Sequence, residues 1–224
     1  MVDKLVKSDK NQKSSFVSHQ ASGLMNVVDR RTPEETRVRI MEVAWDLFRQ
    51  LGARATIADV AEKLGMSSAN VYRFFASKQA LCEAVCAGQL GAMSAAARDI
   101  ASADAPASER IRAILMTLHK AMRDQMINEA RVHEIVDIAI RERWAPIDAY
   151  EMEMAGILGR LVAEGQARGE FAPGDPGELG LLTLCACSGI HHPLLIALYD
   201  RPDSPCKPEQ VVGFALRALA KHRD

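Results

Sequence analysis

The residues best equipped for chemistry in this sequence are polar side chains grouped in one short stretch, residues 67–78, which reads SSANVYRFFASK. Arg73 carries a planar guanidinium that forks onto a phosphate or onto the edge of a guanine base. Tyr72 offers a hydroxyl on a rigid ring and Lys78 offers a point charge, and both groups suit phosphate oxygens. Taken singly, Tyr72 is also an ordinary core aromatic residue and Lys78 an ordinary surface lysine. Whether these side chains have a binding role therefore depends on the elements that position them.

Two short helices joined by a tight turn are predicted to hold these side chains. Thr56 is an N-cap residue, and the apolar residues of 57–64 recur at helical spacing on one face. Gly65 ends this helix and Ser67 supplies a new cap two residues later, so the second helix covers about 68–74. A glycine turn followed at once by a cap is typical of a helix-turn-helix, whose second helix enters the major groove of DNA.

The second of these helices has two faces that require different surroundings. Val71 and Phe75 are four residues apart and are predicted to pack against the preceding helix. The outward face carries small or polar residues, which let a helix backbone approach base edges closely. They are Ser68, Ala69, Asn70 and Arg73.

The order of motifs in the first third of the chain resembles the signature of the TetR/AcrR (tetracycline-repressor-like) transcriptional regulators. The matching positions in and after the two short helices are Thr56, Val60-Ala61, Gly65-Met66-Ser67, Tyr72-Arg73-Phe74-Phe75, Ser77-Lys78 and Leu81. The helix before them fits through Ile40, Ala44, Leu47, Phe48 and Gly52. The resemblance covers roughly residues 32–81, and the order of its motifs is highly specific.

This resemblance implies a three-helix DNA-binding head, an all-helical body that binds a ligand and dimerises, and repression that a small molecule relieves. The residues that carry over to DNA contact are Thr56, Ser67, Ser68, Ala69, Asn70, Tyr72, Arg73 and Lys78. Leu64 replaces a commoner small residue, and Ala69 stands where Gly or Pro is frequent. Ala69 and Asn70 leave the base preference open.

Composition independently favours an all-α fold. Of the 224 residues, 48% are apolar, which is enough for a sizeable core, and only 5% are aromatic. We expect about nine helices in three parts: a flexible basic arm over 1–31, the head over 32–81, and a ligand-binding and dimerisation domain over 82–224. The formal net charge is −1, but residues 1–81 carry 13 Lys and Arg against 9 Asp and Glu, and the remainder carries 15 against 20. A basic head on an acidic body is what a local phosphate contact requires.

The first 29 residues are rich in Lys, Ser, Asn and Gln and show little periodicity, so we expect them to be mostly disordered. The alternative is an arm whose basic side chains contact phosphates or the minor groove. Its candidates are Lys4, Lys7, Lys10, Lys13, Arg30 and Arg31. After them, Thr32 and Glu35 form a capping box, with Pro33 between them, that starts a helix ending near Leu51.

A long helix over about 78–101 is predicted to link the head to the body. In the family that the chain resembles, this fourth helix is the lever that carries a ligand signal to the DNA-binding head. Cys82 and Cys86 lie one turn apart on it and suggest either a redox switch or ordinary packing. Packing is favoured, because thiols on successive turns of one helix are poorly placed for a disulfide.

The ligand is expected among three consecutive helices, from the one over about 106–123 to the one over about 147–168. Flexible methionines and amphipathic aromatic side chains suit an adaptable pocket for a small, largely apolar effector. The candidates for ligand contact are Met122, Met126, Trp144, Tyr150 and Met154. An ordinary core in which methionine fills gaps explains Met122 and Met126 equally well by spacing, and the resemblance is what favours a pocket.

The last two helices are expected to form a homodimer. The segment 179–190 is apolar nearly all round and so must be buried on every side, which a lone body of this size would find hard to arrange. With the final helix, about 208–222, it could pack on a second copy as a four-helix bundle. The apolar residues of that final helix are Val211, Val212, Ala215, Leu216 and Leu219. Two heads held in this way would read a palindromic DNA operator.

A metal-site interpretation arises for two cysteines and two histidines, with core or dimer packing as the alternative. They are Cys185, Cys187, His191 and His192. On a continuous helix these four side chains do not converge, so we predict neither a metal nor a cofactor. The five cysteines form no zinc-finger or extracellular spacing, which indicates a reducing cytoplasm. No membrane span is predicted, because polar residues and Pro193 interrupt the longest apolar stretch, 179–199.

The sequence predicts a ligand-responsive DNA-binding transcriptional regulator, and first of all a repressor that binds a palindromic operator as a dimer and is released by an effector. One alternative is a ligand-independent activator or architectural DNA-binding protein, which no ligand would release. Another is an all-helical binding protein or enzyme with a vestigial head. No nucleophile elbow, phosphate-binding glycine loop or paired-carboxylate pattern occurs, so an enzyme is not predicted.

Overall fold

A computed structural model defines the backbone of most of the chain. It describes residues 32–128, 131–199, 201, 203–204 and 206–221, with the side chains of 126–128 and 197–199 left aside. The predicted basic arm, with its lysines and with Arg30 and Arg31, lies outside the described residues.

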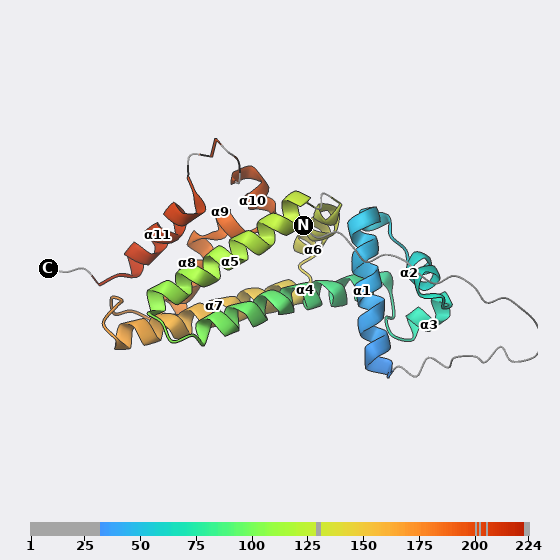
Figure 1. The fold of residues 1–224 in the computed structure, drawn as a ribbon, viewed down its shortest axis with the longest axis horizontal. Coiled ribbons are helices and arrows are strands. Elements are labelled where there is room, and N and C mark those ends of the chain that lie inside the picture. The colour runs from blue at the N-terminus through green and yellow to red at the C-terminus, as the bar shows by residue number, and fades with distance from the viewer. Residues whose placement is uncertain (1–31, 129–130, 200, 202, 205, 222–224) are drawn as a thin grey trace, which may run out of the picture. The chain divides into compact units, whose positions relative to one another are not determined.

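Eleven α-helices and one short 3-10 helix make up the described part of the chain, and no strand occurs there (Figure 1). The first six elements are α1 (Pro33–Leu51), η1 (Gly52–Arg54), α2 (Ile57–Leu64), α3 (Ser68–Tyr72), α4 (Lys78–Ala101) and α5 (Ala107–Asn128). The others are α6 (Val132–Arg141), α7 (Ala145–Ala167), α8 (Pro176–Ala186), α9 (Ser188–His191), α10 (Pro193–Tyr199) and α11 (Pro208–Leu219). The all-α prediction is confirmed. The count exceeds the expected nine because the apolar segment after α7 is divided into three helices.

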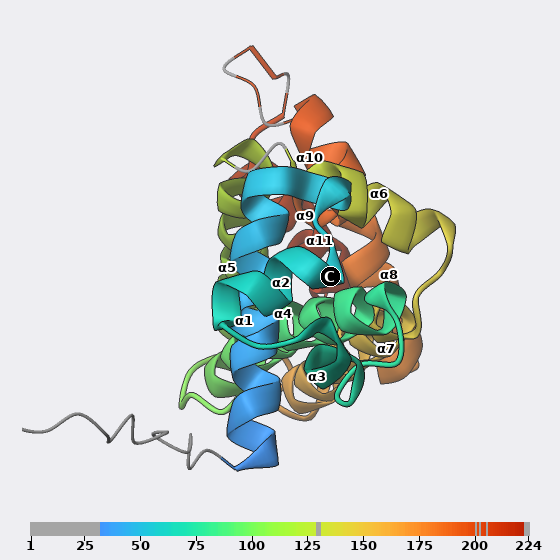
Figure 2. The same cartoon turned by 90° about the vertical axis from the view of Figure 1, so that its right-hand side faces the viewer.

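Helices α1, α2 and α3, which with η1 we call the head, lie next to one another in Figures 1 and 2. They share one hydrophobic core. Thr32 and Glu35 form the predicted capping box of α1, in which each side chain accepts a hydrogen bond from the other residue's backbone N–H. The buried side chains include Ile40, Ala44 and Phe48 of α1, Val60 and Ala61 of α2, and Val71 and Phe75 in and after α3. The helical periodicity predicted the buried positions of α2 and α3, and the positions of α1 are those that fit the family resemblance.

Helix α4 begins in the head and continues beyond it. Ser77 caps its first turn, and its bounds, Lys78 to Ala101, are those predicted from the sequence. The helix packs against α1 near its start and against α5 and α7 further along (Figure 1). By length and composition it is the one described helix apolar enough to cross a membrane, and core helices of soluble proteins pass the same test.

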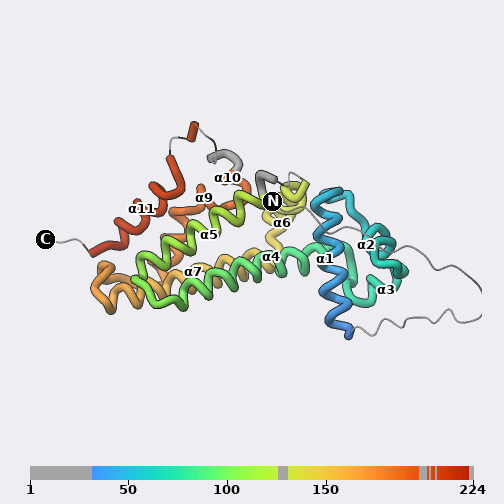
Figure 3. The backbone as a smooth tube through the Cα atoms, in the orientation of Figure 1, coloured from blue at the N-terminus to red at the C-terminus, as the bar shows by residue number. Residues whose placement is uncertain are grey.

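Helices α5 to α11, which we call the body, surround a second core. Its largest fully buried side chains come from α5 and α7 and are Ile111, Ile114, Leu115, Met154, Ile157, Leu158 and Leu161. Helix α8 packs along α7, and α9, α10 and α11 each contact α5. Figure 3 shows the course of the backbone through these helices as a tube. The two predicted body helices α5 and α7 are therefore the centre of this core.

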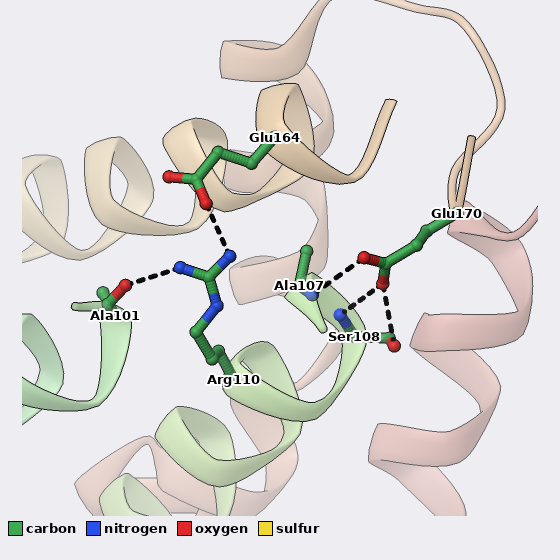
Figure 4. Close-up of polar contacts among 6 residues, drawn as sticks. All are labelled: Ala101, Ala107, Ser108, Arg110, Glu164 and Glu170. Atoms are coloured by element: carbon green, nitrogen blue, oxygen red, sulfur yellow. Dashed lines mark hydrogen bonds and ion pairs between the residues drawn. The ribbon is translucent and has the colours of Figure 1, made fainter. Parts of the chain in front are cut away.

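A cluster of polar side chains links the C-terminal end of α4, the first turn of α5 and the C-terminal part of α7 (Figure 4). The buried guanidinium of Arg110 donates to the backbone carbonyl of Ala101 and to the carboxylate of Glu164. Glu170 accepts hydrogen bonds from the backbone N–H groups of Ala107 and Ser108, at 3.1 Å each. These N–H groups have no partner inside α5, so the distant carboxylate caps that helix.

Two histidines bind backbone carbonyls beside the divided segment α8 to α10. His119 Nδ1 donates to the carbonyl of Ile190 at 2.7 Å, and His191 Nε2 donates to the carbonyl of Leu184 at 3.1 Å. Carbonyl groups at the ends of these short helices gain a side-chain donor in this way, and the Leu184 carbonyl also accepts from the Cys187 N–H at 3.2 Å. The expected continuous helix over 179–190 is therefore wrong: α8 ends at Ala186, and Pro193 begins α10.

Most apolar side chains of α11 pack inside this chain and are not exposed to a partner. Val212, Ala215, Leu216 and Leu219 are buried in the body core, which corrects the expectation that they form the dimer surface. The large hydrophobic side chain that α11 exposes is Phe214, at 65%. On α8, Leu181 and Leu182 are 49% and 53% exposed, so a single copy leaves part of this segment uncovered, and its burial by a second copy stays a prediction.

Candidate nucleic-acid interface and cavity

The turn between α2 and α3 has the geometry that its residues predicted. Gly65 is in the left-handed conformation, with φ 67°, and ends α2. The Ser67 hydroxyl then accepts a hydrogen bond from the Asn70 backbone N–H at 3.2 Å and starts α3. Thr56 caps α2 in the same way through the Asp59 N–H. The hydroxyls of Thr56 and Ser67 therefore have a structural role, and both residues are exposed.

Helix α3 has only five residues and is held in place from one side. Val71 is fully buried and Phe75 is 2% exposed, and both belong to the head core. The guanidinium of Arg37 on α1 lies 4.7 Å from the centre of the Phe75 ring, a cation–π contact that joins the segment directly after α3 to α1. Since five residues cannot form a stable helix alone, these contacts set the orientation of α3.

The other side of α3 faces solvent and carries the predicted DNA-contacting residues. Tyr72 is 51% exposed, and Ala69, Asn70 and Arg73 are also exposed, while Ser68 is half-buried. A small residue, an amide, a phenol and a guanidinium on one exposed helix surface are suited to base edges and phosphates in a DNA groove. Large aromatic side chains are normally buried when nothing binds them, so the exposure of Tyr72 also favours a binding surface.

Lys78 has a partner that the sequence did not indicate. Its Nζ donates to the backbone carbonyl of Ala53 in η1, and the residue is half-buried. This hydrogen bond joins the start of α4 to the turn that follows α1. Phosphate contact by Lys78 stays a prediction, and the structure adds a role in holding the head together.

A cavity of about 510 Å³ lies between the head and the body. It is lined by residues of α1, α4, α5, α6, α7, α8, α9 and the start of α10. Met122, Trp144 and Tyr150, three of the predicted ligand-contacting residues, are in its lining. Met154 is fully buried in the body core and is not among the lining residues, and the side chain of Met126 lies outside the described residues.

Several lining residues were missed by the sequence reasoning. Trp45 and Phe48 come from α1, and the whole inner face of α6 takes part through Val132, Ile135, Val136, Ala139 and Ile140. The spacing of the α6 residues is an amphipathic signal that marks one buried face. No comparable signal exists for Trp45, because its partners in the cavity are distant in the sequence.

The side chains around the cavity are mostly uncharged at neutral pH. Burial raises the pKa of Tyr150 to about 12 and those of the Cys82 and Cys86 thiols to about 11. Burial lowers the pKa of His191 and His192 below 6.5, so both imidazoles are neutral. The thiols are free, and their high pKa values fit the predicted packing role rather than a reactive one.

The three charged residues of the lining are Arg143, Asp148 and Glu151, all exposed. Arg143 and Asp148 form an ion pair with 3.6 Å between Nη2 and Oδ2. In the described part of the chain no group of three or more His, Cys, Asp or Glu side chains is placed to hold a metal ion. The cavity is thus suited to an apolar guest rather than an ion.

Helix α6 also joins the body to the head. The Glu134 carboxylate accepts a hydrogen bond from the Ala53 N–H at 3.4 Å. Gly52 has φ 61°, and a Cβ atom there would lie 2.8 Å from Glu134 Oε2 and 3.0 Å from the carbonyl oxygen of Arg131. We call this contact between η1 and the start of α6 the joint. Only glycine fits at residue 52 in both conformation and space.

The fold and the exposed helix-turn-helix define an all-α DNA-binding protein with a cavity-bearing body. Two family models match it: bacterial regulatory proteins of the tetR family over residues 40–85, and the tetracyclin repressor-like C-terminal domain over residues 107–212. The chain belongs to the TetR family, and it is a DNA-binding transcriptional regulator rather than an enzyme.

Individual relatives are also transcriptional regulators. The HTH-type transcriptional repressor KstR2 of Mycobacterium tuberculosis is 27% identical over 142 residues, which cover 61% of this chain and 70% of KstR2. A TetR/AcrR-family regulator from Thermobifida fusca shares the fold, with 23% identity and a TM-score of 0.58 over 83% of this chain and 96% of that one. The structure of the ketosteroid transcriptional regulator KstR2 of Mycobacterium tuberculosis has 22% identity and a TM-score of 0.50, over 84% and 96%.

Proposed function

We propose that the protein is a dimeric repressor that binds a palindromic DNA operator and is released from it by a small, largely apolar effector. The observation that carries this proposal is the orientation of α3, which buries Val71 and exposes Asn70, Tyr72 and Arg73. In this proposal residues 32–81 bind DNA and residues 82–224 bind the effector and the second copy. A DNA partner also favours a cytoplasmic location.

Dimerisation is supported by the large hydrophobic side chains that α8 and α11 leave exposed. Leu182 is 53% and Phe214 is 65% exposed, and their helices, α8 and α11, contact one another in the body. A second copy would cover them through a two-fold symmetric contact. Two recognition helices related by the same axis would read a palindrome.

Release by an effector is supported by the cavity. Its volume of about 510 Å³ lies in the range of small-molecule sites, and aromatic and aliphatic side chains dominate its lining. Because a relative is named as a ketosteroid regulator, we include polycyclic ketones among the candidate effectors. The effector would stabilise a conformation in which the two heads are wrongly spaced for the operator, through its higher affinity for that conformation.

The first experiment is the selection of random duplex DNA by the purified protein at near-physiological salt, followed by titration of the selected duplex. Recovery of an inverted repeat supports the operator proposal and supplies a probe for effector screening. Purely sequence-independent, salt-sensitive binding contradicts it. An inverted repeat that no apolar compound displaces would favour the alternative of a ligand-independent DNA-binding activator or architectural protein.

A further inference from the structure

The wall of the cavity contains side chains of the DNA-binding head itself. Trp45 and Phe48 of α1 both line it, opposite residues that belong to the body. Phe48 is only 3% exposed and is part of the head core, whereas Trp45 is half-buried. Trp45 is therefore the more exposed of the two head residues in the lining.

Trp45 packs against two separate hydrophobic clusters. On one side it contacts the head core, and on the other it contacts the small cluster of Met122, Val132 and Ile196, which come from α5, α6 and α10. Met122 and Val132 line the cavity as well. A guest next to Trp45 would therefore contact the head and the body at the same time.

The charged side chains around the cavity limit the net charge that a bound molecule can carry. The one cationic side chain in its described lining, Arg143, is already paired with Asp148, and the neighbouring Glu151 is anionic. The imidazoles of His191 and His192 are neutral. An anionic guest would meet two carboxylates and no unpaired cation, which disfavours its binding.

We propose that the cavity binds an uncharged apolar molecule and that Trp45 of the DNA-binding head forms part of its binding site. This inference rests on the proposed effector function and adds the chemical class of the guest and a direct contact with the head. Through this contact with α1 the guest would favour a placement of the head that the operator disfavours, so operator and guest oppose one another. By linkage the operator must weaken the guest's binding by the same factor by which the guest weakens the operator's.

The test uses Nile red, a neutral polycyclic dye whose emission rises in apolar surroundings, titrated into the full chain without DNA. We expect saturable binding that is tighter than that of the anionic dye 1-anilinonaphthalene-8-sulfonate. Trp45→Ala should weaken Nile red binding by about tenfold, the size of a lost aromatic contact. Trp45→Phe, which keeps a ring, should restore most of the affinity, and thermal unfolding checks that each variant is folded.

A second titration, with the selected duplex present at saturation, measures the coupling. In the wild type we expect the duplex to weaken Nile red binding by about fivefold or more, the usual range for coupled sites. Trp45→Ala should lose most of this coupling. The matched control is Tyr150→Ala, which removes an aromatic residue of the body wall and should weaken the dye while keeping the coupling.

The inference is overturned if Nile red fails to saturate, if the anionic dye binds more tightly, or if Trp45→Ala leaves the affinity of Nile red unchanged. Equal loss of coupling in Trp45→Ala and Tyr150→Ala would overturn the direct contact with the head. A wild type that selects no duplex contradicts the proposed function instead, and the titration without DNA still decides whether Trp45 belongs to the site.

Discussion

At the scale of single residues, the exposed and buried side chains of α3 alternate over very short distances. Val71 is fully buried, and the next two residues, Tyr72 and Arg73, are exposed. The buried residue holds the helix, so the exposed residues can be changed without loss of the fold. The same separation allows the proposed roles of Tyr72 and Arg73 in DNA binding to be measured directly.

We predict that Arg73→Ala weakens binding of the selected duplex by ~1–3 kcal/mol if the guanidinium reads a base, and relaxes the preference at that base pair. Tyr72→Phe should have a smaller effect that is equal across sequences, as expected for a phosphate contact. Fluorescence anisotropy at fixed salt measures both. The control is Arg160→Ala, which removes the same charge from an exposed position on α7. An equal loss in Arg73→Ala and Arg160→Ala would show that only net charge matters.

A second residue-scale prediction concerns pH and His191. Burial lowers the pKa of His191 below 6.5 in the folded protein, while the unfolded chain takes up this proton as the pH falls through about 6.5. The unfolded state then binds more protons than the folded state, so the free energy of unfolding decreases as the pH falls. We expect a lower Tm at pH 5.5 than at pH 7.5, and a smaller decrease in His191→Gln, whose amide can still donate to Leu184. Identical pH dependence in the two proteins would exclude His191 as a cause.

At the scale of elements, the head is attached to the body by more than the long helix α4. Glu134 of α6 accepts from Ala53 of η1, and Lys78 of α4 donates to the carbonyl of the same residue. Ala139 and Trp144 of the body are also part of the head core. Helix α6 therefore takes part in both features: its inner face lines the cavity, and its first turn forms the joint.

We predict that Gly52→Ala destabilises the protein by roughly 1–3 kcal/mol, because alanine is strained at φ 61° and its Cβ would collide with Glu134 and Arg131. Urea unfolding followed by circular dichroism measures the change. The matched control is Gly91→Ala in α4, where a Cβ meets nothing within 4 Å. That substitution should stabilise the protein by about 0.5–1 kcal/mol, since glycine is unfavourable inside a helix. Equal effects would mean that the joint is not tightly packed.

At the scale of the whole molecule, the proposed dimer surface differs from the one that periodicity indicated. The buried residues of α11 complete the core of a single copy, and the exposed Phe214 and Leu182 lie on α11 and α8. A surface made of a few large side chains on two helices is compatible with a symmetric contact, in which a small number of residues carry most of the binding energy.

We predict that Phe214→Asp and Leu182→Asp each raise the dissociation constant of the dimer by about tenfold or more, because each change places two unpaired charges in the symmetric contact. Sedimentation velocity over a range of concentrations measures this effect. The control is Met152→Asp, which introduces the same charge at the most exposed large hydrophobic residue, on α7. If all three variants self-associate like the wild type, the dimer uses another surface. Loss of the dimer should also weaken operator binding.

The sequence by itself determined the features that depend on neighbouring residues. Caps at Thr32, Thr56 and Ser67 and the left-handed Gly65 are where the sequence placed them. A cap or a turn requires only a few adjacent residues of the right type, and the buried face of a helix follows from a period of 3.6 residues. The head, its recognition helix and the limits of α4 were therefore predictable.

Only the tertiary structure decided which faces meet. Periodicity shows that Trp144 and the inner face of α6 are apolar, but it does not show that Trp45, about a hundred residues earlier, lies beside them around one cavity. It also could not tell that the apolar face of α11 fills this chain's own core while Phe214 stays exposed. The physical reason is that the hydrophobic effect has no direction: an apolar face is stabilised equally by its own body, a partner or a ligand, and only the packed chain selects among them.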